Sequence, residues 1–196
     1  PLDAFPAAQW DYQLFYRENL DAAVAAFEAD PAASVRALFR AGDPKTVGQP
    51  SMLASVRARG GWFNGAPAPD VPRDPRVLSE AEEAAYAEAL GRNGFRAPAS
   101  WYLNAEANAA YAARAKATWR LEMPVLFLHG AYDGICETLV SDLAAPMRDH
   151  CADLTEAVVP SGHWMAQERP REVNAALARW LAGARPELWR VAPGPA

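Results

Sequence analysis

The sequence predicts an α/β protein in two parts: a helical domain over residues 1–120 and a β-α-β-α unit over residues 121–183. Apolar residues in the first part recur every three to four positions, as on one face of an α-helix. The second part instead contains short continuous apolar runs, which are typical of strands in a parallel sheet covered on both faces. A Pro-rich tail, residues 184–196, follows the second part.

Four helices are expected in the helical domain. The first places Leu20, Val24 and Phe27 on one face. The third begins with Ser79 and has Glu82 three residues later, which is the pattern of a capping box. A Pro-rich loop should precede it. The expected helices span residues 18–30, 31–42 (stopping at Gly42), 79–94 and 103–120, and the loop spans 65–75.

Strands and helices are expected to alternate in the C-terminal part: strand 123–130, helix 138–151, strand 154–160 and helix 171–183. The last helix should turn Val173, Leu177, Trp180 and Leu181 inward. Because two strands alone do not make a stable parallel sheet, the sequence predicts that further strands come from elsewhere.

The composition is that of an ordinary soluble globular protein, with 51% hydrophobic and 22% charged residues and a net charge of −5. Lys45 and Lys116 are the only lysines, so no basic cluster indicates nucleic-acid binding. No apolar run reaches the ~18 residues of a membrane span. Cys136 and Cys151 show neither metal-ligand spacing nor a cluster of partners. A reducing, cytoplasmic setting is expected rather than a disulfide.

An acid and a histidine follow the two expected strands. Asp133 lies in "LHGAYDGIC" and His163 in "VVPSGHWMAQERP", and the interval holds one crossover helix and the next strand. Both side chains should therefore meet at one edge of the sheet, where a carboxylate can orient an imidazole that acts as a base. The alternatives are that Asp133 is a helix N-cap or turn residue and that His163 is a structural or solvated residue. His129 and His150 are expected to be structural.

Four stretches of the sequence resemble those of a known protein family. "PVLFLHGAYDGIC" and "SGHWMAQERPREVNAALARWL" resemble the C-terminal part of the α/β-hydrolase fold, and most closely that of the soluble epoxide hydrolase family. In the helical domain, "WDYQLFYRE" and "GFRAPASWYLN" are similar to the two cap motifs of that family. The resemblance covers roughly residues 8–182. It implies a partial α/β-hydrolase fold, with a helical cap followed by the last β-α-β-α of the sheet.

The resemblance also implies roles for individual residues. Tyr12 and Tyr102 would protonate the oxygen of a small-molecule epoxide, while His163, held by Asp133, would activate the water that hydrolyses an aspartyl ester to release a diol. No metal and no organic cofactor would be needed. Tyr16 is the main alternative to Tyr12, and aromatic packing is the alternative role for both cap tyrosines. Gln13, Trp101 and Trp164 would line the substrate site as neighbours of these residues.

The nucleophilic aspartate and the His-Gly-x-Pro oxyanion motif of the family are not found in the sequence. We therefore expect part of an epoxide hydrolase that is inactive without an N-terminal segment of the same or a separate chain; a homo-oligomer is also possible. Another α/β-hydrolase such as a haloalkane dehalogenase, a truncated fragment and a non-catalytic interaction module are the alternatives.

Overall fold

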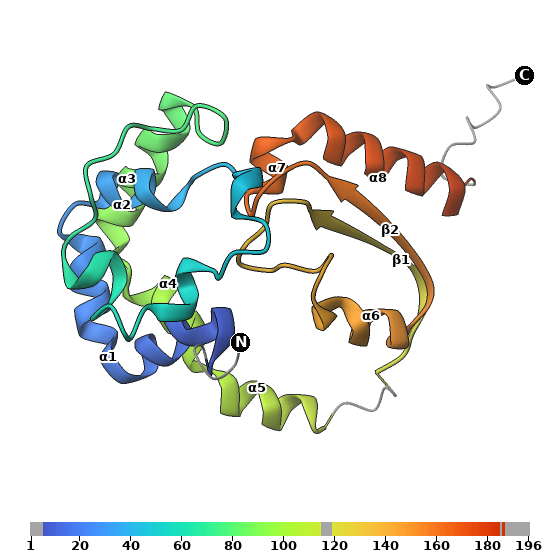
Figure 1. The fold of residues 1–196 in the computed structure, drawn as a ribbon, viewed down its shortest axis with the longest axis horizontal. Coiled ribbons are helices and arrows are strands. Elements are labelled where there is room, and N and C mark those ends of the chain that lie inside the picture. Colours follow the sequence, from blue (N-terminus) through green and yellow to red (C-terminus); the bar gives the residue numbers. More distant parts are fainter. Residues whose placement is uncertain (1–5, 115–118, 185, 187–196) are drawn as a thin grey trace, which may run out of the picture.

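The structure is a computed structural model that describes residues 6–114, 119–184 and 186. Figure 1 shows two lobes side by side: a helical lobe (residues 6–114) and a β/α lobe (residues 119–184). The α/β class predicted from the sequence is observed, with helices first and parallel strands after them. The expected tail lies outside the described residues except for residues 184 and 186.

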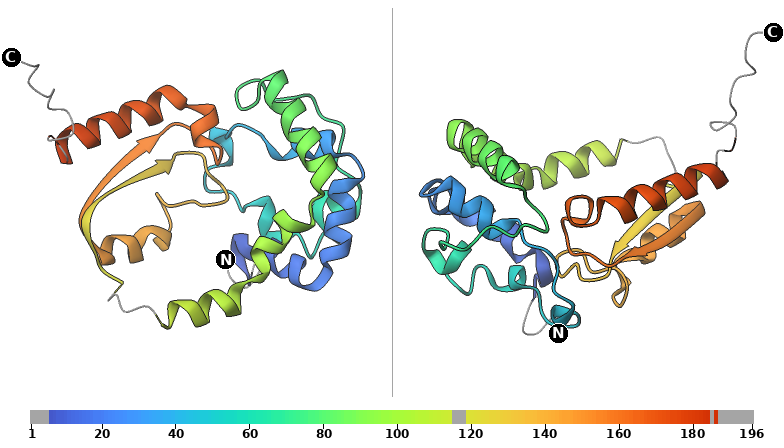
Figure 2. Two further views of the ribbon diagram at one scale, coloured as in Figure 1. Left: turned by 180° about the vertical axis from the view of Figure 1, so that it is seen from behind. Right: turned by 90° about the horizontal axis from the view of Figure 1, so that it is seen from above.

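Helices of several lengths build the helical lobe, and short 3₁₀ turns connect them. Figure 2 shows α3 and α2 running along the outer side of this lobe, and α5 leading towards the first strand. The α-helices are α1 (Asp11–Glu28), α2 (Pro31–Leu38), α3 (Glu80–Asn93), α4 (Arg96–Ser100) and α5 (Ala105–Ala112). The 3₁₀ turns are η1 (Ala8–Trp10), η2 (Pro44–Thr46), η3 (Met52–Ser55), η4 (Trp62–Gly65) and η5 (Trp101–Leu103).

The expected helices are present, but several bounds differ. The capping box at the start of α3 is confirmed, since Ser79 and Glu82 exchange hydrogen bonds with each other's backbone amides. Helix α2 ends at Leu38 and not at Gly42, because Phe39 turns out of the helix with ψ of 84° and stacks on aromatic neighbours. Helix α5 is much shorter than expected, and residues 115–118 of that prediction lie outside the described residues.

The β/α lobe contains two parallel strands, β1 (Leu121–Gly130) and β2 (Cys151–Val159), paired so that Gly130 lies opposite Val159. Helix α6 (Ala145–His150) follows a short 3₁₀ turn, η6 (Asp142–Ala144). Helices α7 (Met165–Glu168) and α8 (Pro170–Ala184) follow β2. Figure 1 shows α6 and α8 on either side of the strand pair, whose carboxyl ends face the helical lobe.

The helix expected over residues 138–151 is wrong in its first half. The carboxylate of Glu137 accepts hydrogen bonds from the amides of Leu139, Val140 and Ser141, and these bonds hold the chain in a turn. Regular α-helix therefore begins only with α6. A side chain competing for backbone amides in this way is a common reason for a late helix start.

The strands are less covered than their sequence predicts. Met123 in β1 is 59% exposed and Val158 in β2 is 56% exposed. Leu177 in α8, expected to face inward, is 39% exposed. The described residues form a sheet of these two strands alone, so each apolar strand has few elements to pack against. Val24 and Phe27 of α1, in contrast, are buried in the helical lobe as expected.

Trp164 joins the two lobes. Its ring stacks on Phe39 with a centroid distance of 4.1 Å, and its indole N–H donates a 2.9 Å hydrogen bond to the carbonyl of Leu38. It also packs against the buried cluster of Val35 and Leu78 in the helical lobe. The β/α lobe is thus anchored at the end of α2.

Two glycines bring the backbones of the lobes into direct contact. A methyl group on Gly42 would lie 2.6 Å from Cα of Gly162, and one on Gly162 would lie 2.6 Å from Cα of Gly42. One carboxylate oxygen of Glu168 accepts hydrogen bonds from both amides, at 3.1 Å from Gly42 and 2.9 Å from Gly162. These three residues are called the glycine junction below.

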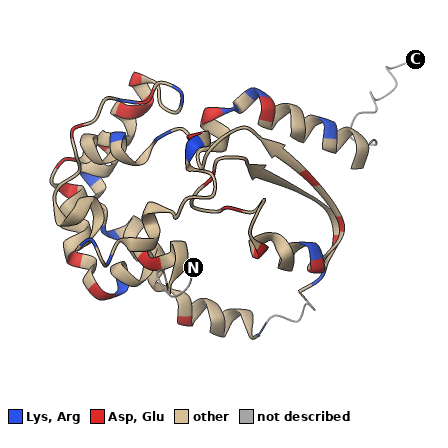
Figure 3. Cartoon of the chain, in the orientation of Figure 1, with Lys and Arg blue, Asp and Glu red and all other residues tan. Residues whose placement is uncertain are grey.

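No helix in the described part of the chain is long and apolar enough to cross a membrane. Figure 3 shows acidic and basic residues interspersed along both lobes.

The close contact at the glycine junction predicts that a single methyl group added to Gly162 destabilises the fold. Gly162→Ala should lower the free energy of unfolding by about 1–3 kcal/mol, because the added carbon meets backbone that has no room to move. Gly183→Ala in α8 is the control, since nothing lies within 4 Å of its added methyl group and alanine favours helix. Urea unfolding of both variants measures the difference, and equal stability of the two would contradict the close contact.

Candidate active site

The loops after β1 and β2 leave the sheet at the same end, because the two strands are parallel. Backbone hydrogen bonds hold the loops together: Ala131 N–H donates to the carbonyl of Val159, and Tyr132 N–H donates to that of Ser161, each at 2.9 Å. The sheet edge therefore fixes the positions of the side chains that follow.

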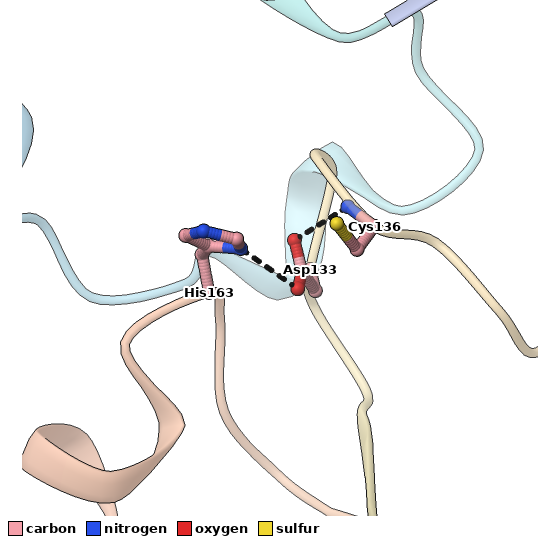
Figure 4. A group of neighbouring side chains, drawn as sticks. All are labelled: Asp133, Cys136 and His163. Carbon is pink, nitrogen blue, oxygen red and sulfur yellow. Dashed lines mark hydrogen bonds and ion pairs between the residues drawn. The ribbon is translucent and has the colours of Figure 1, made fainter. Parts of the chain in front are cut away.

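Asp133 and His163 meet at this edge, as their positions in the sequence predict. The carboxylate oxygen Oδ2 of Asp133 lies 3.1 Å from Nδ1 of His163 (Figure 4). The other oxygen, Oδ1, accepts hydrogen bonds of 2.9 Å from the amides of Ile135 and Cys136. Both carboxylate oxygens are thus engaged, and the orientation of the acid is fixed. Nε2 of His163 is the ring nitrogen left to act on another group.

The charges of the pair reinforce each other. Burial alone would raise the pKa of Asp133, but its hydrogen bonds to His163 and to the amides of Cys136 and Ile135 outweigh burial and lower the pKa. The hydrogen bond to Asp133, followed by the nearby thiol of Cys136, raises the pKa of His163 to about 9. At neutral pH the pair is therefore an imidazolium beside a carboxylate.

Cys136 is a neighbour that the sequence analysis missed. A ring nitrogen of His163, a carboxylate oxygen of Asp133 and Sγ of Cys136 lie within 4.8 Å of one another. The expectation that neither cysteine has a cluster of partners is therefore wrong for Cys136. Its place three residues after Asp133 was the one available signal, because only the fold brings His163, from the loop after β2, close to Cys136. Cys136 and Cys151 are both free thiols.

The two cap tyrosines also come together. The rings of Tyr12 in α1 and Tyr102 in η5 are edge to face, with centroids 5.1 Å apart. Burial raises the pKa of Tyr12 to about 12, so the phenol stays protonated. Nε2 of Gln13 donates a 3.2 Å hydrogen bond to its hydroxyl oxygen, which leaves the hydroxyl hydrogen free to be donated elsewhere.

Tyr16 belongs to the same aromatic group. It stacks on Tyr102 at 5.5 Å and on Trp62 at 5.9 Å, and burial raises its pKa. Tyr12, Tyr16 and Tyr102 are called the tyrosine cluster below. Tyr16 lies fully within the core, whereas Tyr102 is 39% exposed. The hydroxyl of Tyr12 accepts its hydrogen bond from Gln13, whereas the indole of Trp62 lies beside the hydroxyl of Tyr16.

Ile135 connects the loop that carries Asp133 with the helical lobe. Its side chain packs against the core cluster that contains Tyr12. The nearby thiol of Cys136 contributes to the raised pKa of both Tyr12 and His163. The loop after β1 is thus in contact with the core of the helical lobe to which Tyr12 belongs.

The other predicted site residues lie in different surroundings. Gln13 contacts Tyr12, as described. Trp101 lies on η5 beside Tyr102 and is 78% exposed. Trp164 follows His163 in the chain, but its indole is committed to Phe39 and Leu38. The two histidines expected to be structural lie away from the pair: His129 is buried between Thr138 and Glu156, and His150 ends α6.

The chain is similar in sequence and in structure to known epoxide hydrolases. Epoxide hydrolase A of Mycobacterium tuberculosis is 30% identical over 179 residues, which cover 88% of this chain and 52% of that protein. Bifunctional epoxide hydrolase 2 of Rattus norvegicus is 27% identical over 173 residues, or 88% of this chain and 29% of that protein. The crystal structure of epoxide hydrolase A from Mycobacterium thermoresistibile superposes with a TM-score of 0.64 at 28% identity, covering 88% of this chain and 52% of that chain.

The match extends over most of this chain but over only about half or less of each relative. No family model matches the sequence. The likeness in sequence and in three-dimensional structure confirms the resemblance stated above and the partial α/β-hydrolase fold.

The ion pair predicts a measurable proton affinity. The NMR titration of His163 should give a pKa of about 9, and Asp133→Asn should bring it back towards the ordinary value of about 6.5. Because the folded state holds this proton more tightly, the pair stabilises the fold below about pH 6.5, and this contribution is lost as the pH rises through about 9. His163→Gln identifies the resonance, and an unchanged pKa in Asp133→Asn would contradict the pairing.

Glu168 should act through acceptance of hydrogen bonds and not through its charge. Glu168→Ala leaves two amides of the glycine junction without a partner and should cost at least about 1–3 kcal/mol of unfolding free energy. Glu168→Gln is the matched control, because both bonds go to one oxygen and an amide oxygen can accept both. Urea unfolding and hydrogen exchange at Gly42 and Gly162 measure the effect; equal losses in the two variants would refute it.

Proposed function

Since the chain belongs with the epoxide hydrolases of the α/β-hydrolase type, we propose that it supplies the proton donors and the hydrolytic base of an enzyme that converts epoxides into vicinal diols. The observation that carries this proposal is the hydrogen-bonded Asp133–His163 pair, together with the packing of the neighbouring Ile135 against the core cluster that contains Tyr12. Each half of the reaction needs one pair, either Tyr12 with Tyr102 or Asp133 with His163.

In the first step a carboxylate attacks one carbon of the epoxide, forming a C–O ester bond and breaking the ring C–O bond. The ring oxygen takes the electron pair and needs a proton. Tyr12 is suited to supply it, because a buried phenol with a pKa of about 12 keeps its proton until an alkoxide forms. Tyr102, whose ring lies edge to face with that of Tyr12, is the second donor. Two phenols on one oxygen also stabilise the charge where it develops.

In the second step water attacks the ester carbonyl. Nε2 of His163 takes a proton from the water as the new bond forms, and Asp133 stabilises the resulting imidazolium through Nδ1. The tetrahedral intermediate then collapses as the ester C–O bond breaks: the imidazolium of His163 gives its proton to the departing alkoxide, and the second proton of the water returns to the phenolate left by the first step. This releases the diol and restores the carboxylate. The base must be neutral to begin this step, so the raised pKa of His163 makes hydrolysis of the ester the pH-sensitive half of the reaction.

The attacking carboxylate is proposed to come from a segment outside these 196 residues, in the same or a separate polypeptide. The partly uncovered strands support this assembly. Apolar side chains of both strands, including Met123 and Val158, are more than half exposed in the described residues. A further strand beside β1 would hydrogen-bond to the unpaired side of β1. It would also bring another loop to the carboxyl end of the sheet, where Asp133 and His163 lie.

Replacement of the two phenols tests the proposal. With the nucleophile-bearing segment supplied, Tyr12→Phe or Tyr102→Phe should each lower the rate of diol formation by about 10²–10³, the usual effect of removing one donor to a developing oxyanion. The double variant should be inactive. Tyr111→Phe is the control, because Tyr111 is 73% exposed on α5; Tyr16→Phe should retain most of the activity.

Each outcome separates this proposal from its rivals. Loss of activity in Tyr16→Phe with retention in Tyr12→Phe would move the proton donor to Tyr16. Release of halide from haloalkanes, without diol formation, would identify a dehalogenase. Failure of the assembled protein to turn over any epoxide or haloalkane would favour a non-catalytic interaction module.

A further inference from the structure

The thiol of Cys136 lies within 4.8 Å of the Asp133–His163 pair, yet the proposed epoxide chemistry has no step for a thiol. Figure 4 shows the three side chains grouped at the ends of two loops, with Cys136 and Asp133 on the loop after β1 and His163 on the loop after β2. One donor atom from each lies within 4.8 Å of the other two. A sulfur, an imidazole nitrogen and a carboxylate oxygen thus lie close together.

We propose that Asp133, Cys136 and His163 form a binding site for a divalent cation of the zinc class. Thiolate, imidazole and carboxylate are the three side-chain ligands that zinc takes in proteins. Three protein ligands with one open position is also the arrangement of zinc sites that accept an outside molecule. Mg²⁺ and Ca²⁺ prefer sites built from oxygen ligands, so this mixed set favours zinc over either of them.

The donor atoms are near the spacing that a metal requires. At zinc–ligand distances of about 2.0–2.3 Å, tetrahedral donors lie roughly 3.3–3.8 Å apart. Nδ1 of His163 and Oδ2 of Asp133 are 3.1 Å apart, so they need to separate by a few tenths of an ångström. Sγ of Cys136 lies within 4.8 Å of the other two donors, so binding requires it to stay at or move closer to them by up to about 1.5 Å.

The surroundings of the site already orient its ligands. Oδ1 of Asp133, the oxygen that is not bonded to His163, accepts hydrogen bonds from the amides of Ile135 and Cys136, and these bonds orient the carboxylate. The amide of Gly162, next to His163, is held by Glu168. Partners of this kind keep ligands in position and raise the affinity for a metal.

Metal binding and the hydrolytic base would exclude each other, and this consequence rests on the proposed function. A cation bound through Nδ1 takes the place of the proton shared with Asp133. A cation bound through Nε2 occupies the nitrogen that would accept a proton from water. In either mode His163 ceases to be a base, so zinc acts here as an inhibitor and not as a cofactor. Binding itself does not depend on what the enzyme does.

The experiment titrates the reduced full chain with Co²⁺, whose near-ultraviolet charge-transfer absorption reports thiolate ligation, and then displaces it with Zn²⁺. The wild-type chain should show the thiolate band. Cys136→Ser should abolish the band and weaken Zn²⁺ binding more than about tenfold, the least that loss of even an outer supporting contact costs. Cys151→Ser is the matched control and should keep both. His163→Gln should also weaken Zn²⁺ binding, and it provides a second test of the site if Cys136→Ser does not fold.

A further readout needs no variant: Zn²⁺ should protect Cys136, located by mass spectrometry, from alkylation by iodoacetamide, whereas Mg²⁺ should not. An unchanged band and affinity in Cys136→Ser, or alkylation of Cys136 at the same rate with and without Zn²⁺, overturns the site. Because the titration measures no turnover, its failure leaves the epoxide hydrolase proposal intact, and an inactive enzyme leaves the titration valid.

Discussion

The contact between Gly42 and Gly162 is the constraint on which the relation of the two lobes depends. Backbone meets backbone there because neither residue has a side chain, and Glu168 binds both amides with one oxygen. His163 follows directly in the chain and is itself followed by Trp164, which is stacked on Phe39. The base is thus held between two anchored neighbours, and both anchors reach into the helical lobe that carries the tyrosine cluster.

The electrostatics of the site favour retention of protons on both sides. Asp133 holds a proton on His163, and burial holds the phenolic proton on Tyr12. A site in this state is prepared to donate, which suits the opening of an epoxide ring. It is less prepared to accept a proton from water, because His163 must first give one up. Ring opening requires a group that donates a proton, whereas hydrolysis of the ester requires a neutral His163 that accepts one. The Asp133–His163 hydrogen bond sets the pKa of His163 and therefore how far hydrolysis is favoured at a given pH.

The parts of the molecule set by local rules could be predicted from the sequence. The capping box of Ser79 and Glu82 and the meeting of Asp133 with His163 follow from spacing and from the geometry of parallel strands. What escaped prediction depends on individual side-chain contacts. Glu137 binds three nearby amides in a turn and delays α6, which the apolar pattern does not reveal. Phe39 leaves α2 to stack on Trp164, which is distant in the sequence. Cys136 escaped for the same reason, since its neighbour His163 comes from another loop.

One mismatch between sequence and structure is informative about assembly. The continuous apolar run of β1 is typical of a strand covered on both faces, yet in the described chain only His129 of that strand is fully buried. A continuous apolar run is not needed in a two-stranded sheet, because the residues on its exposed face could be polar without loss of buried apolar surface. We infer that β1 is suited to a larger sheet than these residues form. In a parallel sheet every carboxyl end lies at the same edge. A strand added beside β1 in that direction would therefore bring the residue after it to the edge where His163 lies, which is where the proposed mechanism needs a nucleophile.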